Sequence, residues 1–450
     1  MMKATTIIYQ IIFASLLLVG CTKVDLCDEG THPHVVDGFS VTYDWSGLEL
    51  SDDETPERLY FVATRILNTR HMVYQTDKDG KFWVEKGEDE KPETTPDDGD
   101  PETPEGEPVT RDDSTTETPD DDAEPKGEYQ PDIKLPGGEY FMMAFTDPKY
   151  PKVTVTKKDD QGNDLKDKDG KIIRVEEEDK RVSLDGLDEF KVDEAIPVKQ
   201  VKMRHATVEQ KNVSKELVDN RKWADLNPGI GYVRDAGRRL LVARRDYLEL
   251  DAGKNYIQPF DFTSLTQHVD IQFTVQLLAD EKDNQLTMED IQDIYVEMAG
   301  IAPEVSLSTG ILNIAELKRV IVKVTDKKVS QSSDGEKPVV TLSCKASLEV
   351  FGLIGGVDSY TIAGPGVCCI VLYVKTPTDI RAIHAKSNLS KQIKEQEITA
   401  ETGQVNERKK VKDQSVLKIE TPFRIVGLNP EMGSDGVCGW EVVGDIHVDI

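Results

Sequence analysis

The chain has 450 residues, and its 84 Asp and Glu outnumber its 55 Lys and Arg, which gives a formal net charge of −29. Such acidity argues against nucleic acid as a partner, because phosphates are bound by clustered Lys and Arg side chains. The length provides for two or three domains, each with a hydrophobic core of its own.

The first 21 residues have the pattern of a lipoprotein signal peptide. Lys3 is the only charged residue before an apolar run over residues 11–19, and this run is too short to span a bilayer as a helix. Gly20 and Cys21 follow; a lipoprotein signal needs such a cysteine because its thiol is alkylated by a diacylglycerol before cleavage. We predict a signal peptide over residues 1–20 and a membrane anchor on Cys21. A plain secretory signal is the alternative.

A strongly acidic segment follows in the first half of the chain. Between Glu85 and Glu128 there are 19 acidic residues, four basic residues and seven prolines, and Val109 is the only aliphatic side chain larger than alanine. The segment can bury almost no apolar surface and repels itself, so we predict a disordered insertion over residues 86–127. A calcium-binding loop is the alternative, but frequent proline and irregular spacing do not direct ligands to one centre.

The rest of the sequence has the pattern of short β-strands separated by turn residues. Only residues 213–223 suggest a short helix, and a domain boundary falls near residues 253–261. Strands and hairpins are predicted over residues 35–45, 58–67, 71–85, 139–145, 153–175, 238–250, 268–278, 317–324, 339–353, 367–375 and 440–450.

Many short strands with few helices favour an all-β protein built from β-sandwiches, and two tandem sandwiches fit the length. We predict a tether over residues 21–34 and a first β-sandwich domain over residues 35–255, which includes a charged hairpin at about 156–182. A second β-sandwich domain is predicted over residues 256–450.

No group of residues forms a recognisable catalytic, cofactor or metal site. The sequence contains no G-x-S-x-G, Walker or G-x-G-x-x-G motif, so we predict a protein that is not an enzyme and has no cofactor. Two D-K-D-G segments, residues 77–80 and 167–170, are similar to calcium loops, but Leu165 stands at the first ligand position of the second, and turn formation explains both. The strand predicted over residues 268–278 alternates, with Val269, Ile271, Phe273 and Val275 on one apolar face. His268 and Asp270, on the other face, are predicted to lie on a solvated strand face.

The cysteines after Cys21 form no C-x-x-C pair, and Cys27 has histidines nearby only at poor spacing for zinc. Two interpretations stay open for the others. Cys344 could pair with Cys368 or Cys369 in an oxidising compartment, or the cysteines could be free and pack as small apolar groups. The remaining cysteine, Cys438, is equally open.

The predicted mature start, residues 21–27, reads C-T-K-V-D-L-C and is followed by H-P-H at residues 32–34. It resembles a Bacteroides lipoprotein family of unknown function whose members begin with C-x-x-x-D-L-C and H-P-H motifs. That family is similar to the fimbrillin-associated anchor proteins of type V pili, the minor-fimbrium lipoproteins of Bacteroidales. Further segments carry the resemblance across the chain: residues 41–45, 135–140, 262–268, 298–302, 309–310 and 439–442. The acidic insertion and the charged hairpin depart from the family pattern.

The resemblance implies an outer-membrane lipoprotein, exposed at the cell surface, with two transthyretin-like sandwiches. It also implies an anchor or accessory component of a fimbria, a system in which a subunit lacking a strand accepts one from its neighbour. The implied partners are the membrane, through the lipid, and fimbrial subunits. Asp113-Ser114-Thr115 resembles the acceptor for O-glycosylation in Bacteroides, so Ser114 is a candidate acceptor; an incidental match in a Ser/Thr-rich tract is the alternative.

A surface glycan- or nutrient-binding lipoprotein is the alternative function. It would need aromatic side chains gathered on a loop or concave face, whereas the four tryptophans, Trp45, Trp83, Trp223 and Trp440, are spread along the chain. A divergent hydrolase is a third and more distant reading.

The positions of arginine favour an anchor over a shaft subunit. In the resembling system, a protease that cuts after arginine removes the lipidated first strand of shaft subunits, whereas an anchor keeps it. The sequence has no arginine between Cys21 and the predicted strand at 35–45, and the first one downstream is Arg58. We therefore predict a retained first strand. The alternating segment 440–450 could donate a strand to a partner or complete its own sheet.

Overall fold

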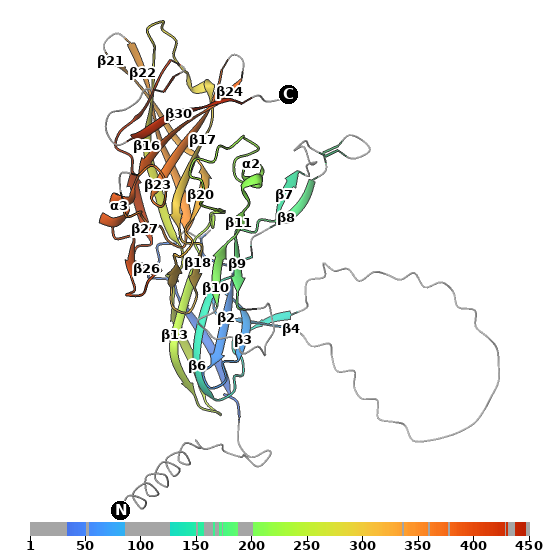
Figure 1. Cartoon of the computed structure of the whole chain (residues 1–450). Helices are drawn as coiled ribbons and strands as arrows, with labels where there is room; N and C mark the ends of the chain where they lie inside the picture. Colours follow the sequence, from blue (N-terminus) through green and yellow to red (C-terminus); the bar gives the residue numbers. More distant parts are fainter. Residues whose placement is uncertain are drawn as a thin grey trace, which may run out of the picture.

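The protein is an elongated, almost entirely β-stranded molecule, which confirms the predicted all-β class (Figure 1). The structure, a computed structural model, describes residues 34–50, 54–85, 127–149, 152–156, 165–166, 171–172, 174–187, 201–334, 337–358, 361–376, 379–427, 429–430 and 437–446. Within these residues the α-helices are short: α2 (Val213–Glu216) and α3 (Ser390–Glu395). The predicted helix over 213–223 is cut short because Asp219 and Asn220 adopt left-handed backbone conformations.

The lower part of the molecule in Figure 1, the lower unit, is built around an antiparallel seven-stranded sheet in the order β15-β13-β6-β2-β3-β4-β5. The predicted hairpin over 71–85 is confirmed, and Gly80 at its turn has a φ of 85°. A Cβ on Gly80 would collide with the carbonyl oxygen of Val41, so only glycine fits there. The strands are β2 (Arg58–Arg65), β3 (His71–Asp77), β4 (Phe82–Glu85), β5 (Gly127–Gln130), β6 (Gly138–Thr146), β13 (Leu241–Leu250) and β15 (Thr263–Ser264).

One face of this sheet is covered by two parallel strands, β1 (Gly38–Asp44) and β14 (Asn255–Asp261). Phe61 on β2 is the centre of the core between these layers. Its ring lies 5.9 Å from that of Phe39, 5.4 Å from that of Phe82 and 5.8 Å from that of Phe260. All four rings are buried, so β1 belongs to the core and is more than an edge.

The other face is covered by a six-stranded sheet in the order β25-β26-β19-β18-β10-β9. Tyr60, Phe145 and Met203 pack in the core between these layers with Val305 and Phe351. Strands from before and after residue 255 therefore share one sheet. The division of the chain into two domains near residue 255 stays a prediction. The strands are β9 (Val182–Asp185), β10 (Lys202–His205), β18 (Glu304–Ser306), β19 (Ile311–Asn313), β25 (Thr399–Glu401) and β26 (Glu407–Lys410).

The upper part of the molecule, the upper unit, is a sandwich of two sheets (Figure 1). One sheet has the order β11-β12-β20-β17-β23-β24-β30. The other has the order β21-β22-β16-β28-β29, with β27 also paired to β16. The strands of the first sheet are β11 (Thr207–Val208), β12 (Tyr232–Val233), β20 (Lys318–Lys323), β17 (Ile291–Ile301), β23 (Val367–Lys375), β24 (Ile380–Asn388) and β30 (Val437–Ile446). Those of the second are β21 (Asp326–Asp334), β22 (Lys337–Val350), β16 (Gln267–Leu278), β28 (Phe423–Val426), β29 (Asn429–Pro430) and β27 (Gln414–Lys418).

The core of the upper unit confirms the alternation read from the sequence. On β16 every second side chain is buried, which places the predicted apolar face, Val269, Ile271, Phe273 and Val275, between the two sheets. The hairpin predicted over residues 153–175 is also present, as β7 (Lys152–Thr156) and β8 (Arg174–Glu178), which pair antiparallel.

The three described cysteine side chains are free and buried. Cys344 and Cys368 lie in the core of the upper unit, and Cys369 points to the opposite face of its sheet. Of the two interpretations left open by the sequence, the structure therefore has the free, packed cysteines; the side chains of Cys27 and Cys438 lie outside the described part. No helix among the described residues is long and apolar enough to cross a membrane.

The segment between β11 and β12 closes the outer face of the seven-stranded upper sheet through a buried ion pair. Arg319 Nη1 donates to Glu297 Oε1 at 3.3 Å, and both side chains are buried. Trp223 Nε1 and the Tyr232 hydroxyl donate to the other Glu297 oxygen at 3.2 and 3.0 Å, and Arg319 Nη2 donates to Asp225 at 2.6 Å. Removing one charge would leave the other buried without compensation, so this network fixes the segment on the sheet.

Residues 86–126 lie outside the described part of the chain, and replacing them by a two-residue Asn-Gly turn should not lower the melting temperature and should raise it by at most a few degrees. Glu85 lies directly opposite Gly127 in the antiparallel pair β4–β5, so a two-residue turn can join the strands. Each halving of loop length makes loop closure more favourable by about 0.6 kcal/mol, so the roughly four halvings from 41 residues to two contribute less than about 3 kcal/mol. Thermal unfolding followed by circular dichroism is the measurement.

The matched control extends the deletion to Gln130, which removes β5 and should lower the melting temperature. A loss of many degrees in the shorter deletion would show that residues 86–126 pack against the folded chain.

Candidate functional site

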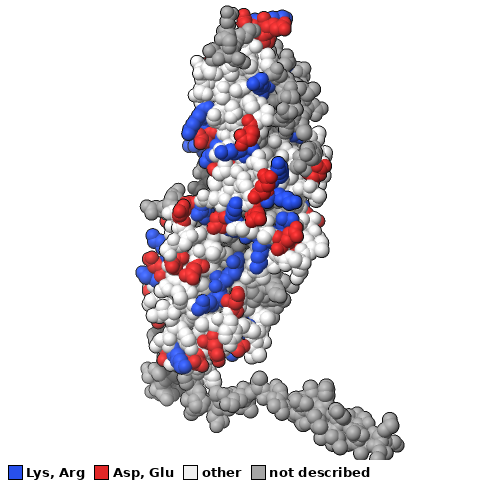
Figure 2. All heavy atoms as spheres, turned by 90° about the vertical axis from the view of Figure 1, so that its left-hand side faces the viewer, with Lys and Arg blue, Asp and Glu red and all other residues white. Residues whose placement is uncertain are grey.

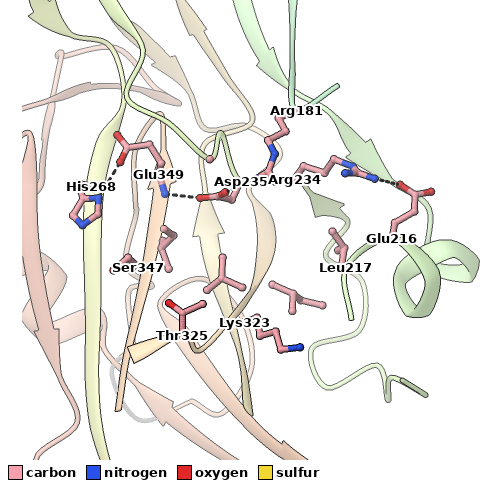
Figure 3. Close-up of a pocket in the computed structure, with 14 residues that line it drawn as sticks. Arg181, Glu216, Leu217, Arg234, Asp235, His268, Lys323, Thr325, Ser347 and Glu349 are labelled. Carbon is pink, nitrogen blue, oxygen red and sulfur yellow. Dashed lines mark hydrogen bonds and ion pairs between the residues drawn. The ribbon is translucent and has the colours of Figure 1, made fainter. Parts of the chain in front are cut away.

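A polar groove of about 490 Å³ lies where the upper unit meets the segments that lead to the lower unit (Figure 3). Its charged side chains come from separate elements: Arg181 precedes β9, Asp235 follows β12, Glu349 lies near the end of β22, His268 is near the start of β16 and Lys323 ends β20. Sequence positions up to 168 residues apart therefore meet in one groove. The groove is lined by charges of both signs.

His268 and Asp270 lie on the partly exposed face of β16, opposite the apolar residues as predicted, but the sequence did not predict the pairing of His268 with Glu349. His268 Nδ1 lies 3.0 Å from Glu349 Oε2, its Nε2 lies 3.2 Å from Asp270 Oδ1, and the histidine is half-buried. The hydrogen bond to Glu349 raises the pKa of His268 above its usual value, and both carboxylates add to the effect. The reason is register: antiparallel pairing of β16 with β22 puts Glu349 directly opposite His268.

Asp235 is the most strongly perturbed acid of the groove. Its Oδ2 accepts a hydrogen bond from the Glu349 backbone N–H at 2.7 Å, and its Oδ1 lies 3.1 Å from Arg181 Nη1. The side chain is only 13% exposed, and burial raises the pKa of Asp235 to about 6. Its protonation therefore changes in the mildly acidic range, where an unperturbed aspartate stays ionised.

The arginines of the groove are held by further carboxylates. Arg181 Nε donates to Asp179 Oδ2 at 2.6 Å. Arg234 bridges Asp179 at 3.2 Å and Glu216 at 3.0 Å, which ties α2 to the entrance of β9. The groove thus joins elements of both units by paired charges. The hydroxyl of Ser347, which also lines the groove, donates to Asp270 Oδ1 at 2.6 Å.

No group of three or more His, Cys, Asp or Glu side chains in the described part of the chain could hold a metal ion. Asp77, in the first D-K-D-G segment, uses Oδ1 to accept from the N–H groups of Asp79 at 3.0 Å and Lys81 at 2.8 Å. This carboxylate therefore closes the hairpin turn. The second D-K-D-G segment, residues 167–170, lies outside the described residues.

The first strand, β1, has backbone partners on both of its edges. It pairs in parallel with β14 over seven residues. On the other edge Phe39 and Ile133 exchange two hydrogen bonds, at 2.8 and 2.9 Å, and Val36 N–H donates to Leu135 O at 2.9 Å. β1 therefore occupies a complete slot, in which its own side chains fill the core.

The last described strand, β30, has a different position. It pairs antiparallel with β24 and ends the order of its sheet, so no strand among the described residues pairs with its outer edge. It lies in the upper unit, whereas the described chain begins at the lower end of the molecule (Figure 1). An unpaired edge of this kind can hydrogen-bond to an added strand.

The tryptophans whose side chains are described do not form one surface. Trp45 stacks on Phe262 at 4.3 Å, and Trp223 is buried in the upper unit. Trp83 meets Tyr129 edge to face, at 5.0 Å, where β4 pairs with β5 at the edge of the seven-stranded sheet of the lower unit. The aromatic platform that a glycan-binding protein needs is therefore not assembled from these three tryptophans.

The two modification candidates, Cys21 and Ser114, lie outside the described residues, so their predicted lipidation and O-glycosylation stay predictions. On the face in Figure 2, Lys and Arg alternate with Asp and Glu along the length of the molecule. That face carries no extended patch of one sign.

No protein-family model matches the sequence, and no curated protein matches it. Among solved structures, a "putative adhesin" from Bacteroides ovatus ATCC 8483 matches with a TM-score of 0.38 and 11% identity, over 92% of this chain and 99% of that one. The fimbrial anchor protein Mfa2 from Porphyromonas gingivalis matches with a TM-score of 0.28 and 9% identity, over 87% and 90% of the two chains.

A fimbrial assembly protein from Parabacteroides distasonis ATCC 8503 matches with a TM-score of 0.26 and 8% identity, over 90% of this chain and 93% of that one. The structures similar to this chain thus include adhesion and fimbrial proteins of Bacteroidales, the group that the sequence motifs resemble. Because the TM-scores and identities are low, nothing about the function of this chain follows from the likeness.

The stability of Asp235→Asn minus that of wild type should be larger at about pH 7 than at about pH 3.5. Since the pKa of Asp235 is raised from 3.8 to about 6 in the folded state, the contribution of Asp235 to the stability of wild-type protein falls as the pH rises from the first value to the second. Asparagine does not ionise, so the variant should gain up to about 3 kcal/mol on wild type across this range. Urea unfolding of both proteins at several pH values measures the difference.

The control is Asp280→Asn. Hydrogen bonds from Asn284 hold the pKa of the exposed Asp280 below its usual value, so here wild type should lose stability, relative to the variant, as the pH falls. The same sign of pH dependence in both variants would contradict the assignment of Asp235.

Proposed function

We propose that the protein is a non-enzymatic, lipid-anchored component of the outer membrane, exposed at the cell surface, that anchors or assists a fimbria. The proposal joins the signal pattern ending at Cys21, the family resemblance of the mature start and the position of β1. The observation that carries it is β1: a chain that keeps this strand has no vacant slot to accept a donor strand in its lower unit.

Retention of β1 suits an anchor for a further reason. The first arginine after Cys21 is Arg58, which is also the first residue of β2. Cleavage there would remove β1 with Val36, Phe39 and Val41, all buried in the core of the lower unit. It would also remove residues 45–57, which one extended donor strand could not replace.

The contact to a fimbrial subunit is proposed at the other end of the molecule. A strand of the subunit would add to the outer edge of β30, with main-chain hydrogen bonds supplying affinity and alternate side chains supplying specificity. A lipid below the lower unit and an open edge in the upper unit would place membrane and fibre at opposite ends. Two transthyretin-like sandwiches, divided near residue 255, remain part of this proposal.

Cys21→Ser should release the protein from the membrane fraction or leave it unprocessed, because the hydroxyl cannot be alkylated in place of the thiol. Detergent phase partitioning and intact-mass analysis of the variant and of wild type measure the result. The control, Cys27→Ser, alters the next cysteine and should keep the lipid. A Cys21→Ser protein that is still cleaved after Gly20 and stays membrane-bound would overturn the anchor.

Protein recovered from cells should begin at Cys21 and retain β1. N-terminal analysis by mass spectrometry is the measurement, and treatment of the purified protein with an arginine-specific protease is the companion experiment. The protein should stay monomeric after this treatment, because β1 is held on both edges. A mature chain that starts after Arg58, or self-polymers after protease treatment, would instead indicate a shaft subunit.

A further inference from the structure

We propose that the lower end of the molecule rests on the membrane surface through a small apolar rim, formed by Val35, Ile66, Leu67, Tyr247 and Ile257. The proposal rests on the lipid attachment proposed above, which brings the start of the described chain close to a bilayer. The partner is a lipid surface, in which apolar side chains enter the boundary between headgroups and acyl chains.

Strand registers bring the apolar rim together. β2 and β13 both run toward the start of β6, since Arg65 lies opposite Tyr140 and Leu250 lies opposite Gly138. The turn after β2 and the end of β13 are therefore at the same end of the seven-stranded sheet. β1 and β14 are parallel and both start at this end, the lower end in Figure 1.

Local contacts hold the apolar rim on the ends of the strands. The Ile66 N–H donates to the Glu139 carbonyl at 2.9 Å, and the Tyr247 hydroxyl donates to the Glu139 side chain at 2.8 Å. The Val35 carbonyl accepts from the Gly253 N–H at 2.9 Å. Side chains from three separate segments are thus fixed at one end by the core sheet beneath them.

The side chains of the apolar rim are well exposed although they are apolar. Leu67 is 84% exposed, Ile257 73%, Tyr247 53%, Ile66 42% and Val35 37%. Single exposed apolar side chains are common on soluble proteins, but five of the thirteen large ones in the described residues lie at this end. It is also the end from which the chain continues toward Cys21.

The predicted tether makes so small a contact effective. Only 13 residues lie between Cys21 and Val35, a span of at most ~50 Å when fully extended. A short tether holds the apolar rim at an effective concentration in the millimolar range at the bilayer. Side chains that would not bind a membrane on their own can then stay in contact with it.

The charges around the apolar rim do not select anionic lipids. Lys254 Nζ is paired with Asp251 at 2.6 Å, and Glu139 accepts from Tyr247. Both signs are present, so the contact should persist on zwitterionic lipid and at high salt.

The test uses Leu67→Trp in the lipidated protein, reconstituted in phosphatidylcholine vesicles with brominated acyl chains. Flotation with the vesicles reports the tether, and quenching of the added tryptophan reports contact with the acyl chains. The matched control is Val329→Trp, since Val329 is half exposed on β21 in the upper unit. Each variant is corrected for the fluorescence of the parent protein.

We expect the fluorescence from Trp at 67 to be quenched at least about twofold more than that at 329, with no change at high salt. Adding Tyr247→Ser and Ile66→Ser should reduce this quenching while flotation stays complete. Equal quenching at the two positions, with full flotation, overturns the apolar rim. A blue shift of the residue 67 fluorescence without vesicles, with no lipid quenching, would instead show that a second copy covers this end.

A second arm separates this inference from the lipidation of Cys21. In it, the Cys21→Ser chain carries a hexahistidine tag in place of residues 1–20 and is captured on vesicles that contain a nickel-chelating lipid. Selective quenching at position 67 here supports the apolar rim even if the native protein fails to float. Failure of quenching here, together with flotation of the lipidated protein, rejects the apolar rim and leaves the anchor intact.

Discussion

The central sheet of the lower unit has two apolar faces, and the architecture depends on covering both. Six consecutive residues of β2, from Leu59 to Thr64, are buried. Phe61 faces the layer of β1 and β14, whereas Tyr60 and Val62 face the six-stranded sheet. An antiparallel sheet commonly keeps one face in water. Because both faces of this sheet are apolar, it requires two further layers. One is supplied by the first strand of the chain, and the other draws on strands from the second half.

This need to cover both faces explains why single strands could be predicted from the sequence but their arrangement in sheets could not. Alternation located β16 with the correct buried face, and the turn residues around Gly80 located the β3–β4 hairpin. β2 was also located, within the strand predicted over residues 58–67, and its buried residues form a continuous run. A run of that kind does not show which strands cover it, and nothing in the local sequence pairs β10 with β18, about a hundred residues later. Sheet order and the sharing of sheets between the two halves were therefore beyond local pattern.

The polar groove was missed for the same reason. His268 and Asp270 alternate with buried side chains, and a polar residue at such a position usually faces water. Glu349 is 81 residues away and becomes the cross-strand neighbour of His268 only through the pairing of β16 with β22. The raised pKa of Asp235 likewise results from burial, which no local motif encodes. Cys21, by contrast, could be proposed as a lipidation site from sequence alone, because processing signals are linear.

The parallel pairing of β1 with β14 has a mechanical consequence. In a lipid-anchored protein that carries a fibre, tension would enter through the N-terminus of β1 and leave through the upper unit, roughly along the strands of the lower unit (Figure 1). Pulling a strand along its own axis loads all its ladder hydrogen bonds together, whereas pulling across the axis breaks them one by one. The seven-residue ladder with β14, and the bonds to Ile133 and Leu135 on the other edge, would thus be sheared as a set. The lifetime of such an attachment under load is set by the rate of forced unfolding, so β1 would act as a clamp against tension.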